Sequence, residues 1–283
     1  MKDFKHKVAV ITGAANGIGF GIAERCAQEG MKVVLAGINE DNLLKAETRL
    51  KQTGTDLLVV RTDVSKRKDV EALAQKTLAT FGAIHLLVNN AGVGAGTSVW
   101  ESSWEDWEWV VNVNLWGVLH GVKVFTPLML AQDTEAHIVN VASVAGLLAS
   151  HPSAPYTVTK HAVVALTESM YYSLVERDAK LKVSVLCPGW VKTSILKSGR
   201  NRPSELNVKP ARGSLRREDL EAYRRMEAAL EAGMSIEELA DHTMQAVRTE
   251  QLYVLSHPKH TSQIQERFDN ILGQKNPAKG SWV

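Results

Sequence analysis

The sequence predicts an α/β fold in which a doubly wound parallel sheet is covered by helices on both faces. Short apolar runs rich in valine, isoleucine and leucine recur along the chain, and each is followed by a turn signal and a longer segment with helical periodicity. This alternation is typical of β-α units, whose strands lie buried between two helical layers. At 283 residues, the chain is long enough for one large domain with a well-buried core, so we expect a single domain over residues 1–283.

Six of these apolar runs are the predicted strands, at residues 8–11, 33–36, 57–60, 86–88, 138–141 and 183–186. Residues 252–255 form a plausible last strand. Helical periodicity is clear at 19–28 and 70–81, and another helix is expected to carry Tyr156 and Lys160 and to continue through Met170. Because residues four apart lie on one helical face, the phenol and the ammonium of this pair should lie side by side.

The alternation stops after Val191. A polar stretch that contains Pro203 and Pro210 leads there to a charged amphipathic segment at 216–232. We interpret residues 194–234 as an inserted helical lid near the C-terminus, partly loop and partly helix, and not as a second domain. Ser235 then begins a helix, because Glu238 lies at the third position of a capping box.

Composition excludes several classes of protein. The net charge is +2 with 23% charged residues, so nothing indicates nucleic acid or an anionic membrane as the main partner. The apolar run at 8–11 is too short for a secretory or spanning segment, and we expect a cytoplasmic protein. Cys26 and Cys187 are expected to be reduced thiols. No cluster of His, Cys and carboxylates has metal-ligand spacing, so no metal is expected.

A glycine-rich turn lies between the first predicted strand and the first helix. Small residues at such a junction let the backbone approach a pyrophosphate at a helix N-terminus. A plain tight turn is the alternative, but the position close to the start of the chain favours dinucleotide binding. The predicted cofactor-binding residues of this turn are Gly13, Asn16, Gly17, Ile18 and Gly19.

Further motifs follow this turn in order. They are Asp63-Val64, Asn89-Asn90-Ala91-Gly92, Asn114 within Val-Asn-Val-Asn-Leu, Ser143, Tyr156 with Lys160, and Pro188-Gly189 followed by Val191 and Thr193. In these motifs the chain resembles, from about Lys5 to Thr193, the compact, non-extended branch of the short-chain dehydrogenase/reductase family. The resemblance implies a Rossmann-like, NAD(P)-binding domain. It also implies cofactor contacts at Asp63, Val64, Asn90, Ala91, Gly92, Tyr156, Lys160, Pro188, Gly189, Val191 and Thr193.

The resemblance further implies four catalytic residues: Asn114, Ser143, Tyr156 and Lys160. A tyrosine with a pKa near 10 exchanges a proton efficiently near neutrality only if its phenolate is stabilised, which a lysine ammonium and an oxidised nicotinamide can do. Tyr156 is therefore the expected acid/base, with Lys160 lowering its pKa and binding the nicotinamide ribose. Ser143 would hold the substrate oxygen, and Asn114 would position a relay water. Asn112 is the alternative for the relay.

The residues after the second predicted strand leave the cofactor preference open. NAD-preferring relatives place an aspartate where Gly37 stands, and NADP-preferring relatives usually place an arginine just after it or a basic residue in the glycine-rich turn. Here Gly37 and Ile38 supply neither. Without a carboxylate to repel a 2′-phosphate, we expect tolerance of both cofactors with a lean to NADP(H), and Asn39 is a candidate polar contact.

The resemblance also implies a mostly apolar substrate pocket. Its predicted lining is Val93, Gly94, Ala95, Val144, Ala145, Leu148, His151 and Trp190, with Tyr223, Met226 and Leu230 from the lid. The lid residues could close over a bulky ketone or secondary alcohol, or they could simply be the docking surface of the lid. The tryptophans at 100, 104, 107 and 109 are predicted to lie in the core and in helix packing instead of in a ligand site.

The predicted function is an NAD(P)-dependent alcohol dehydrogenase or ketone reductase acting on a medium-to-bulky apolar small molecule. One alternative is a 3-oxoacyl carrier-protein reductase, whose members generally lack so long an insertion before Ser235. A second is a non-catalytic dinucleotide-binding regulator, although such a module has no evident need for all four catalytic residues. By resemblance, a homodimer or homotetramer is expected.

Overall fold

A parallel sheet forms the centre of the computed structural model, which describes residues 1–149, 153–208 and 217–278. Within these ranges the sheet has seven strands in the order β3-β2-β1-β4-β5-β6-β7. The strands are β1 (Val8–Thr12), β2 (Lys32–Gly37), β3 (Leu57–Arg61), β4 (Leu86–Asn89), β5 (Ala136–Val141), β6 (Leu181–Leu186) and β7 (Tyr253–Val254). The predicted α/β fold with a parallel sheet is confirmed.

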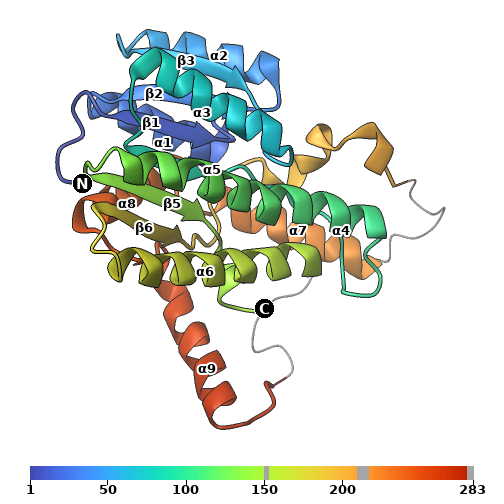
Figure 1. The fold of residues 1–283 in the computed structure, drawn as a ribbon. Coiled ribbons are helices and arrows are strands. Elements are labelled where there is room, and N and C mark those ends of the chain that lie inside the picture. The colour runs from blue at the N-terminus through green and yellow to red at the C-terminus, as the bar shows by residue number, and fades with distance from the viewer. Residues whose placement is uncertain (150–152, 209–216, 279–283) are drawn as a thin grey trace.

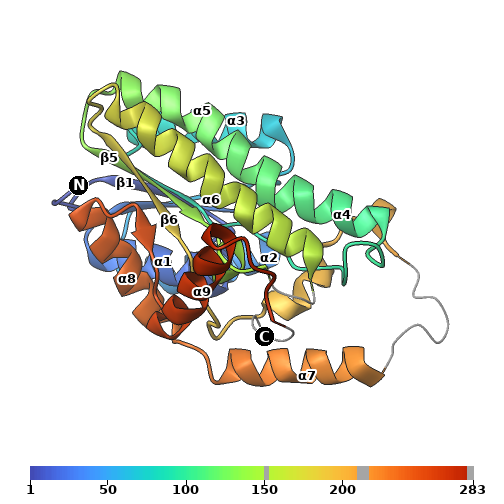
Figure 2. The same ribbon diagram turned by 90° about the horizontal axis from the view of Figure 1, so that it is seen from below.

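Helices cover both faces of the sheet (Figure 1 and Figure 2). The α-helices of the described residues are α1 (Gly17–Gln28), α2 (Glu40–Lys51), α3 (Arg67–Phe81), α4 (Trp104–Val111), α5 (Gly117–Ala131), α6 (Ala154–Val175), α7 (Arg217–Glu231), α8 (Ile236–Thr249) and α9 (Thr261–Leu272). Shorter turns are the π-helical η1 (Asn112–Trp116) and the 3₁₀ turns η2 (Val144–Gly146), η3 (Ile195–Asn201), η4 (Ser204–Leu206) and η5 (Pro258–His260).

Alternate residues of each strand divide the core into two layers. In β1, Ala9 and Ile11 pack with α1, α2 and α8, whereas Val8 and Val10 pack with α3, α5 and α6. All five residues of β1 are buried. Burial on both faces is why the strands read as continuous apolar runs in the sequence.

The order of the strands creates a crossover beside β1. The chain passes from β1 through β2 to β3 on one side, and then returns to pair β4 with the other edge of β1. In open α/β sheets, ligands bind at the carboxyl ends of the strands where the winding reverses. The turns after β1 and β4 lie at this point.

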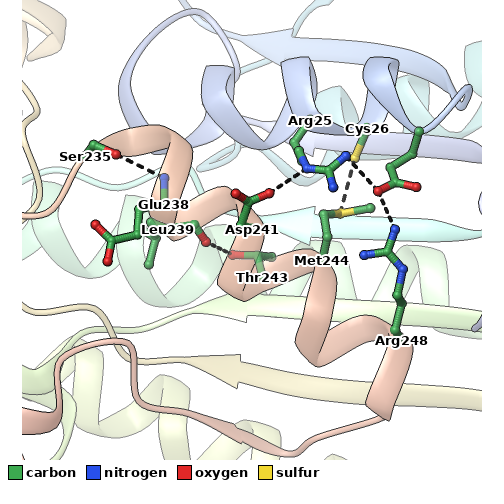
Figure 3. A network of polar contacts seen from close by, with 10 residues as sticks. Arg25, Cys26, Ser235, Glu238, Leu239, Asp241, Thr243, Met244 and Arg248 are labelled. Atoms are coloured by element: carbon green, nitrogen blue, oxygen red, sulfur yellow. Dashed lines mark hydrogen bonds and ion pairs between the residues drawn. The ribbon is translucent and has the colours of Figure 1, made fainter.

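Helix α8 is fastened directly to α1 (Figure 3). Arg25 of α1 pairs with Asp241 of α8 at 2.6 Å, and the sulfur atoms of Cys26 and Met244 are 3.9 Å apart. A Cβ at Gly21 would overlap the side chain of Ile236, so glycine permits this close packing. The predicted start of α8 is correct, because the Glu238 N–H donates to the Ser235 hydroxyl at 3.1 Å.

The predicted lid, residues 194–234, contains η3, η4 and α7. The chain just before this segment pairs with the end of the segment, next to the sheet. Val191 and Met234 form an isolated parallel bridge. The Met234 N–H donates to the Trp190 carbonyl at 3.0 Å, and the Lys192 N–H donates to the Met234 carbonyl at 3.0 Å. The segment is therefore closed at its base, while α7 lies away from the sheet (Figure 2).

The prediction for the tryptophan cluster is wrong at two positions. Trp100 and Trp104 are 85% and 87% exposed, whereas Trp109 is 3% exposed. Ser103 caps α4, so Trp104 is the first residue of the helix. Because Trp104 and Trp109 are five residues apart, they point to different sides of α4, and only Trp109 faces the core.

Candidate active site

The glycine-rich turn after β1 is shaped to leave room next to the start of α1. Gly13 and Gly17 have φ values of +64° and +55°, which L side chains rarely adopt. A Cβ at Gly13 would lie 2.9 Å from the α-carbon of Ala91, and one at Gly19 would lie 2.5 Å from the Gly13 carbonyl oxygen. This turn therefore excludes side chains and packs against the chain that follows β4.

Thr12, a residue that the sequence analysis did not single out, joins the two turns at the crossover. Its hydroxyl accepts from the N–H groups of Asn90 and Ala91 at 2.9 and 3.1 Å, and it donates to the Val88 carbonyl at 3.3 Å. The Asn90 amide donates to the Thr12 carbonyl at 2.8 Å. The only sequence signal for this role is a hydroxyl residue at the end of the first strand.

The N-terminus of α1 is available to an anion. Asn16 has an extended backbone, and in the described chain its side chain makes no capping hydrogen bond. The first N–H groups of a helix need acceptors, and phosphate oxygens are suitable ones. The side-chain-free turn and this helix start thus fit the diphosphate of a dinucleotide.

The segment after β6 reaches both this turn and the catalytic residues. A Cβ at Gly17 would lie 3.5 Å from the γ-methyl of Thr193. At the other end, the Pro188 carbonyl accepts from the Val144 N–H at 2.8 Å and from the Ser143 hydroxyl at 3.4 Å. Residues 188–193 therefore span the distance between the glycine-rich turn and Ser143.

The other predicted cofactor residues lie at the ends of β2 and β3. The Asn39 side-chain oxygen accepts from the Asn42 N–H at 2.9 Å and caps α2. The Asp63 carboxylate accepts from the N–H and the hydroxyl of Ser65 at 3.1 and 2.6 Å. Val64 packs closely on Gly117, where a Cβ would come within 2.7 Å of it. Both loops follow strands at the same edge of the sheet as the glycine-rich turn.

Asn114 lies inside the π turn η1, where the Gly117 N–H bonds the Asn112 carbonyl. Asn114 is fully buried, and its side chain accepts from the Val93 N–H at 2.8 Å and donates to the Val93 carbonyl at 2.9 Å. Its amide also donates to the Thr159 hydroxyl at 3.3 Å. Asn112 is only partly buried. The geometry thus favours Asn114 over Asn112 as the residue that belongs to the site.

Lys160 is buried beside Asn114. Its ammonium donates to the Val141 carbonyl at 2.8 Å. A Cβ at Gly92 would lie 3.5 Å from Asn114 Oδ1 and 3.6 Å from Lys160 Nζ, so the glycine leaves space between the two polar groups. Burial lowers the pKa of Lys160 to about 8, because the charged form is poorly solvated there.

Ser143 and Tyr156 complete the group. The Ser143 hydroxyl follows β5 and accepts from the Ala145 N–H at 3.1 Å. Lys160 Nζ lies 5.5 Å from the centre of the Tyr156 ring. Burial raises the pKa of Tyr156, while its hydrogen bond with Ser143 acts in the opposite direction. The structure therefore brings all four predicted catalytic residues together at the carboxyl edge of the sheet.

The predicted substrate residues do not form one uniform surface. Val93, Leu148 and Leu230 are buried, whereas Tyr223 is 38% exposed and Met226 is partly buried. The Gly94 N–H donates to the Ser198 hydroxyl at 3.3 Å, and the Ala95 carbonyl accepts from the Ser153 hydroxyl at 2.7 Å. Ala145 lies in η2 next to Ser143. His151 lies outside the described residues.

A contact that no sequence pattern indicated attaches the first part of segment 194–234, the predicted lid, to α4. Arg202 pairs with Asp106 of α4 at 2.6 Å and donates to the Leu206 carbonyl at 2.6 Å. Its guanidinium lies 5.1 Å from the centre of the Trp109 ring. Arg202 and Asp106 are 96 residues apart, so no local pattern could have paired them.

Comparisons with known proteins identify relatives of this chain. The sequence profile of the family described as short chain dehydrogenase matches residues 7–204. The CLA biosynthesis dehydrogenase/reductase of Lactiplantibacillus plantarum is 34% identical over 287 residues, with 98% of this chain and 97% of that protein covered. The C alpha-dehydrogenase of Sphingobium sp. is 31% identical over 278 residues, which cover 98% of this chain and 89% of that protein.

A solved structure is similar over almost its whole length. The crystal structure of a short chain dehydrogenase/reductase from Burkholderia phymatum in complex with NAD superposes with a TM-score of 0.94. It is 44% identical in sequence, and 98% of each chain is covered. The similarity extends through the segment between β6 and α8, beyond the residues that the family profile matches.

Proposed function

The chain belongs to the short-chain dehydrogenase family, and we propose that it interconverts a secondary alcohol and a ketone with a medium-to-bulky apolar body, using NAD(P)(H). One observation supports the proposal most strongly. Four side chains lie close together, next to a glycine-rich turn that has no room for side chains: Asn114, Ser143, Tyr156 and Lys160. Family membership makes the chain an oxidoreductase; the alcohol and ketone are our inference from the site.

The cofactor would be held by the turn after β1, the start of α1 and residues 188–193. The NAD complex of the Burkholderia phymatum relative supports this assignment. When bound, the cofactor supplies or accepts the hydride. The protein contributes binding, orientation and control of the proton.

Proton transfer is assigned to the Tyr156 hydroxyl. In the reductive direction Tyr156 donates its proton to the substrate oxygen, which the Ser143 hydroxyl holds beside it. Burial raises the pKa of Tyr156, so the phenolate needs positive charge nearby. Lys160 supplies that charge, and Asn114 would position a relay water that connects Lys160 to solvent. The deprotonated tyrosine is then reprotonated along this route.

We propose that both nicotinamide cofactors are accepted. Gly37 and Ile38 at the end of β2 are uncharged, so no carboxylate stands at Gly37 to repel a 2′-phosphate. Since the Asn39 oxygen caps α2, its amide nitrogen is the atom that could donate to the ribose or phosphate. The carboxylates of Glu40 and Asp41 at the start of α2 would repel a 2′-phosphate and so oppose a preference for NADP(H). Arg61 lies 3.4 Å from Glu40 and offsets part of this negative charge.

We also propose that the protein self-associates through the helical layer of α4 and α5. Within Trp104–Ala131, an 18-residue window has a mean hydropathy of 1.2, and the stretch is long and apolar enough to cross a membrane, a criterion that core helices of soluble proteins also meet. Only 33% of this apolar window is buried, and Trp116 is exposed. A second copy could cover such a surface, as members of this family typically form oligomers. Light scattering would test this.

The decisive experiment follows nicotinamide absorbance with purified protein, NADPH and NADH separately, and a panel of carbonyl compounds. The panel runs from small aliphatic ketones through aryl and polycyclic ketones to an acetoacetyl thioester. Turnover confined to bulky apolar ketones supports the proposal. Turnover of the thioester alone would make the protein a 3-oxoacyl carrier-protein reductase. Cofactor binding without any turnover would make it a non-catalytic regulator.

A further inference from the structure

The loop after β7 meets the turn after β6 through one histidine ring. The Gly189 N–H donates to His257 Nδ1 at 3.0 Å, and His257 Nε2 lies 2.9 Å from the Trp190 carbonyl oxygen. The Ser256 hydroxyl is 2.9 Å from Nδ1. One imidazole thus bonds the N–H of Gly189 and the carbonyl of the next residue, Trp190.

These two bonds fix the protonation state of the ring. A carbonyl oxygen only accepts, so Nε2 must carry a hydrogen to bond Trp190. A backbone N–H only donates, so Nδ1 must be unprotonated to bond Gly189. The neutral imidazole satisfies both groups, whereas the imidazolium would place a hydrogen against the Gly189 N–H.

Gly189 is shaped for this ring. Its Cβ, if present, would lie 2.9 Å from Cγ and 3.0 Å from Cδ2 of His257, and also 2.9 Å from Nε2 of His260. Since Gly189 is not among the glycines with positive φ, the absence of a side chain is required by the approach of the ring and not by backbone conformation. The histidine and the glycine fit each other although they are 68 residues apart.

The Trp190 carbonyl also belongs to the base of the lid, residues 194–234. It accepts from the Met234 N–H at 3.0 Å as well as from His257. Two residues earlier, the Pro188 carbonyl accepts from the Ser143 hydroxyl and from the Val144 N–H. The turn is therefore bonded to Ser143 on one side, to the lid base on the other, and to His257 behind it.

We propose that His257 is a positioning residue, whose neutral imidazole holds the Pro188-Gly189-Trp190 turn in register with Ser143, the bound nicotinamide and the base of the lid. The proposal rests on the proposed function, because it assigns this turn to the cofactor. His257 itself touches neither substrate nor cofactor in this scheme and acts through the peptide groups of the turn.

Protonation of His257 should release the turn. Burial lowers the pKa of His257, and the Trp190 carbonyl opposes this shift. The charged groups facing the ring are His260, at 6.1 Å between ring centres, and Lys259, which lower the pKa, and Glu238, which raises it. Because the pKa lies below its ordinary value, the neutral form prevails at neutrality and is lost only as the pH falls further into the acid range.

The test measures the dissociation constant of NADPH and NADH by fluorescence titration, together with the melting temperature and the kcat and KM of each variant. His257→Asn keeps an acceptor near the Nδ1 position, His257→Gln keeps a donor near the Nε2 position, and His257→Ala keeps neither. Lys259→Ala, an exposed residue of the same loop, is the control. We expect cofactor binding about tenfold weaker in His257→Ala, with smaller losses in the other two variants.

A pH series from about pH 5 to about pH 8 separates positioning from general stability. The affinity of the wild-type protein for the cofactor should fall at the acid end of the series. This fall should be absent from His257→Gln, because an amide does not titrate. KM for the cofactor should rise more than kcat falls. Should the alanine variant fail to fold, the glutamine and asparagine variants and the wild-type pH series still decide the question.

Each outcome has one meaning. Wild-type protein that binds no dinucleotide would overturn the proposed function and this inference with it. Wild-type binding that is unchanged in all three His257 variants would overturn the inference alone. Equal weakening by Lys259→Ala would overturn it too, because any disturbance of the loop would then suffice. The inference is supported if cofactor binding is weaker only in the His257 variants and if His257→Gln no longer shows the fall in affinity at acid pH.

Discussion

The catalytic centre and the lid, residues 194–234, are held in place in opposite ways. Thr12, Asn114 and Lys160 are buried, and each bonds the backbone of a segment far away in the sequence. In the described parts of the lid, most side chains of α7 are exposed, as Tyr223 is. Its polar attachments include Arg202 on Asp106, Ser198 on Gly94, and the paired base at Met234.

We infer from this difference that the buried centre carries out the chemistry and that residues 194–234 determine substrate selectivity. Groups that transfer a proton must be held at fixed distances, and burial with several backbone bonds achieves this. A segment whose described side chains are mostly exposed can open locally at a small fraction of the free energy of global unfolding. We therefore expect substitutions in the centre to change turnover or cofactor affinity, and substitutions in the lid to change substrate affinity.

Tyr156→Phe should have the largest effect, because it removes the exchangeable proton from the centre and leaves the ring in place. We expect kcat/KM to fall by about 100-fold or more, with the cofactor dissociation constant nearly unchanged. Steady-state kinetics and fluorescence titration measure the two quantities. Tyr223→Phe in α7 is the matched control. A variant that kept more than about a tenth of wild-type turnover would exclude Tyr156 as the principal acid/base.

Gly19→Ala should disrupt the turn after β1. The new methyl group would lie 2.5 Å from the Gly13 carbonyl oxygen and overlap the Asn90 side chain, both parts of the rigid centre. Overpacking of this kind costs about 1–3 kcal/mol, so cofactor affinity should fall by about 10-fold or more. Gly199→Ala in the lid is the control, since nothing lies within 4 Å of its Cβ position. Equal affinity of the two variants would contradict the contrast between the regions.

Gly37→Asp should shift cofactor preference without altering the catalytic residues. The carboxylate would accept from the ribose hydroxyls of NAD and repel the 2′-phosphate of NADP. We expect the ratio of kcat/KM for NADH over NADPH to rise by about tenfold. Gly37→Ala tests whether bulk alone matters, because a Cβ meets Leu43 only at ordinary contact distance. The same shift in both variants would show that charge is not the cause.

Arg202→Met should have the smallest effect on chemistry, because it loosens only the lid. It removes the bond to Asp106 while keeping an apolar chain over Trp109. KM for bulky ketones should rise about fivefold, with kcat for the smallest ketones little changed. Because Arg202→Met leaves the Asp106 carboxylate unpaired, Asp106→Asn is combined with it so that no unpaired charge remains. A large fall in the melting temperature of the double variant would mean that residues 194–234 are integral to the fold.

Local patterns predicted the sheet, and the family resemblance of short motifs led to the predicted catalytic group, because both kinds of signal are local. The apolar runs of β1 to β6, the glycine spacing and the Tyr156–Lys160 pair each lie within a few residues. The position of Trp104 was mispredicted because the composition of the segment did not indicate which face of α4 it occupies. The contrast of Trp104 with Trp109 depends on where the Ser103 cap starts the helix.

Interactions between distant segments could not be predicted from the sequence. Asn89 donates to Asn140 at 2.8 Å, Asn140 donates to Thr167 at 3.1 Å, and Gly121 provides the space in which Asn89 lies. These residues are ordinary in isolation, and only the register of β4 with β5 brings them together. The bond between Arg202 and Asp106 and the fit of His257 on Gly189 have the same origin.

The bridge between Val191 and Met234 has a consequence for how such proteins diversify. The chain leaves and re-enters the body of the protein through one paired position, so the length between those points is not set by the sheet. For a closed loop, doubling its length costs only about 0.6 kcal/mol of entropy. Residues 194–233, which follow the proposed cofactor contact at Thr193, can therefore be regarded as an exchangeable insert. A different insert between the same two anchors would change the substrate range and leave the catalytic residues unaltered.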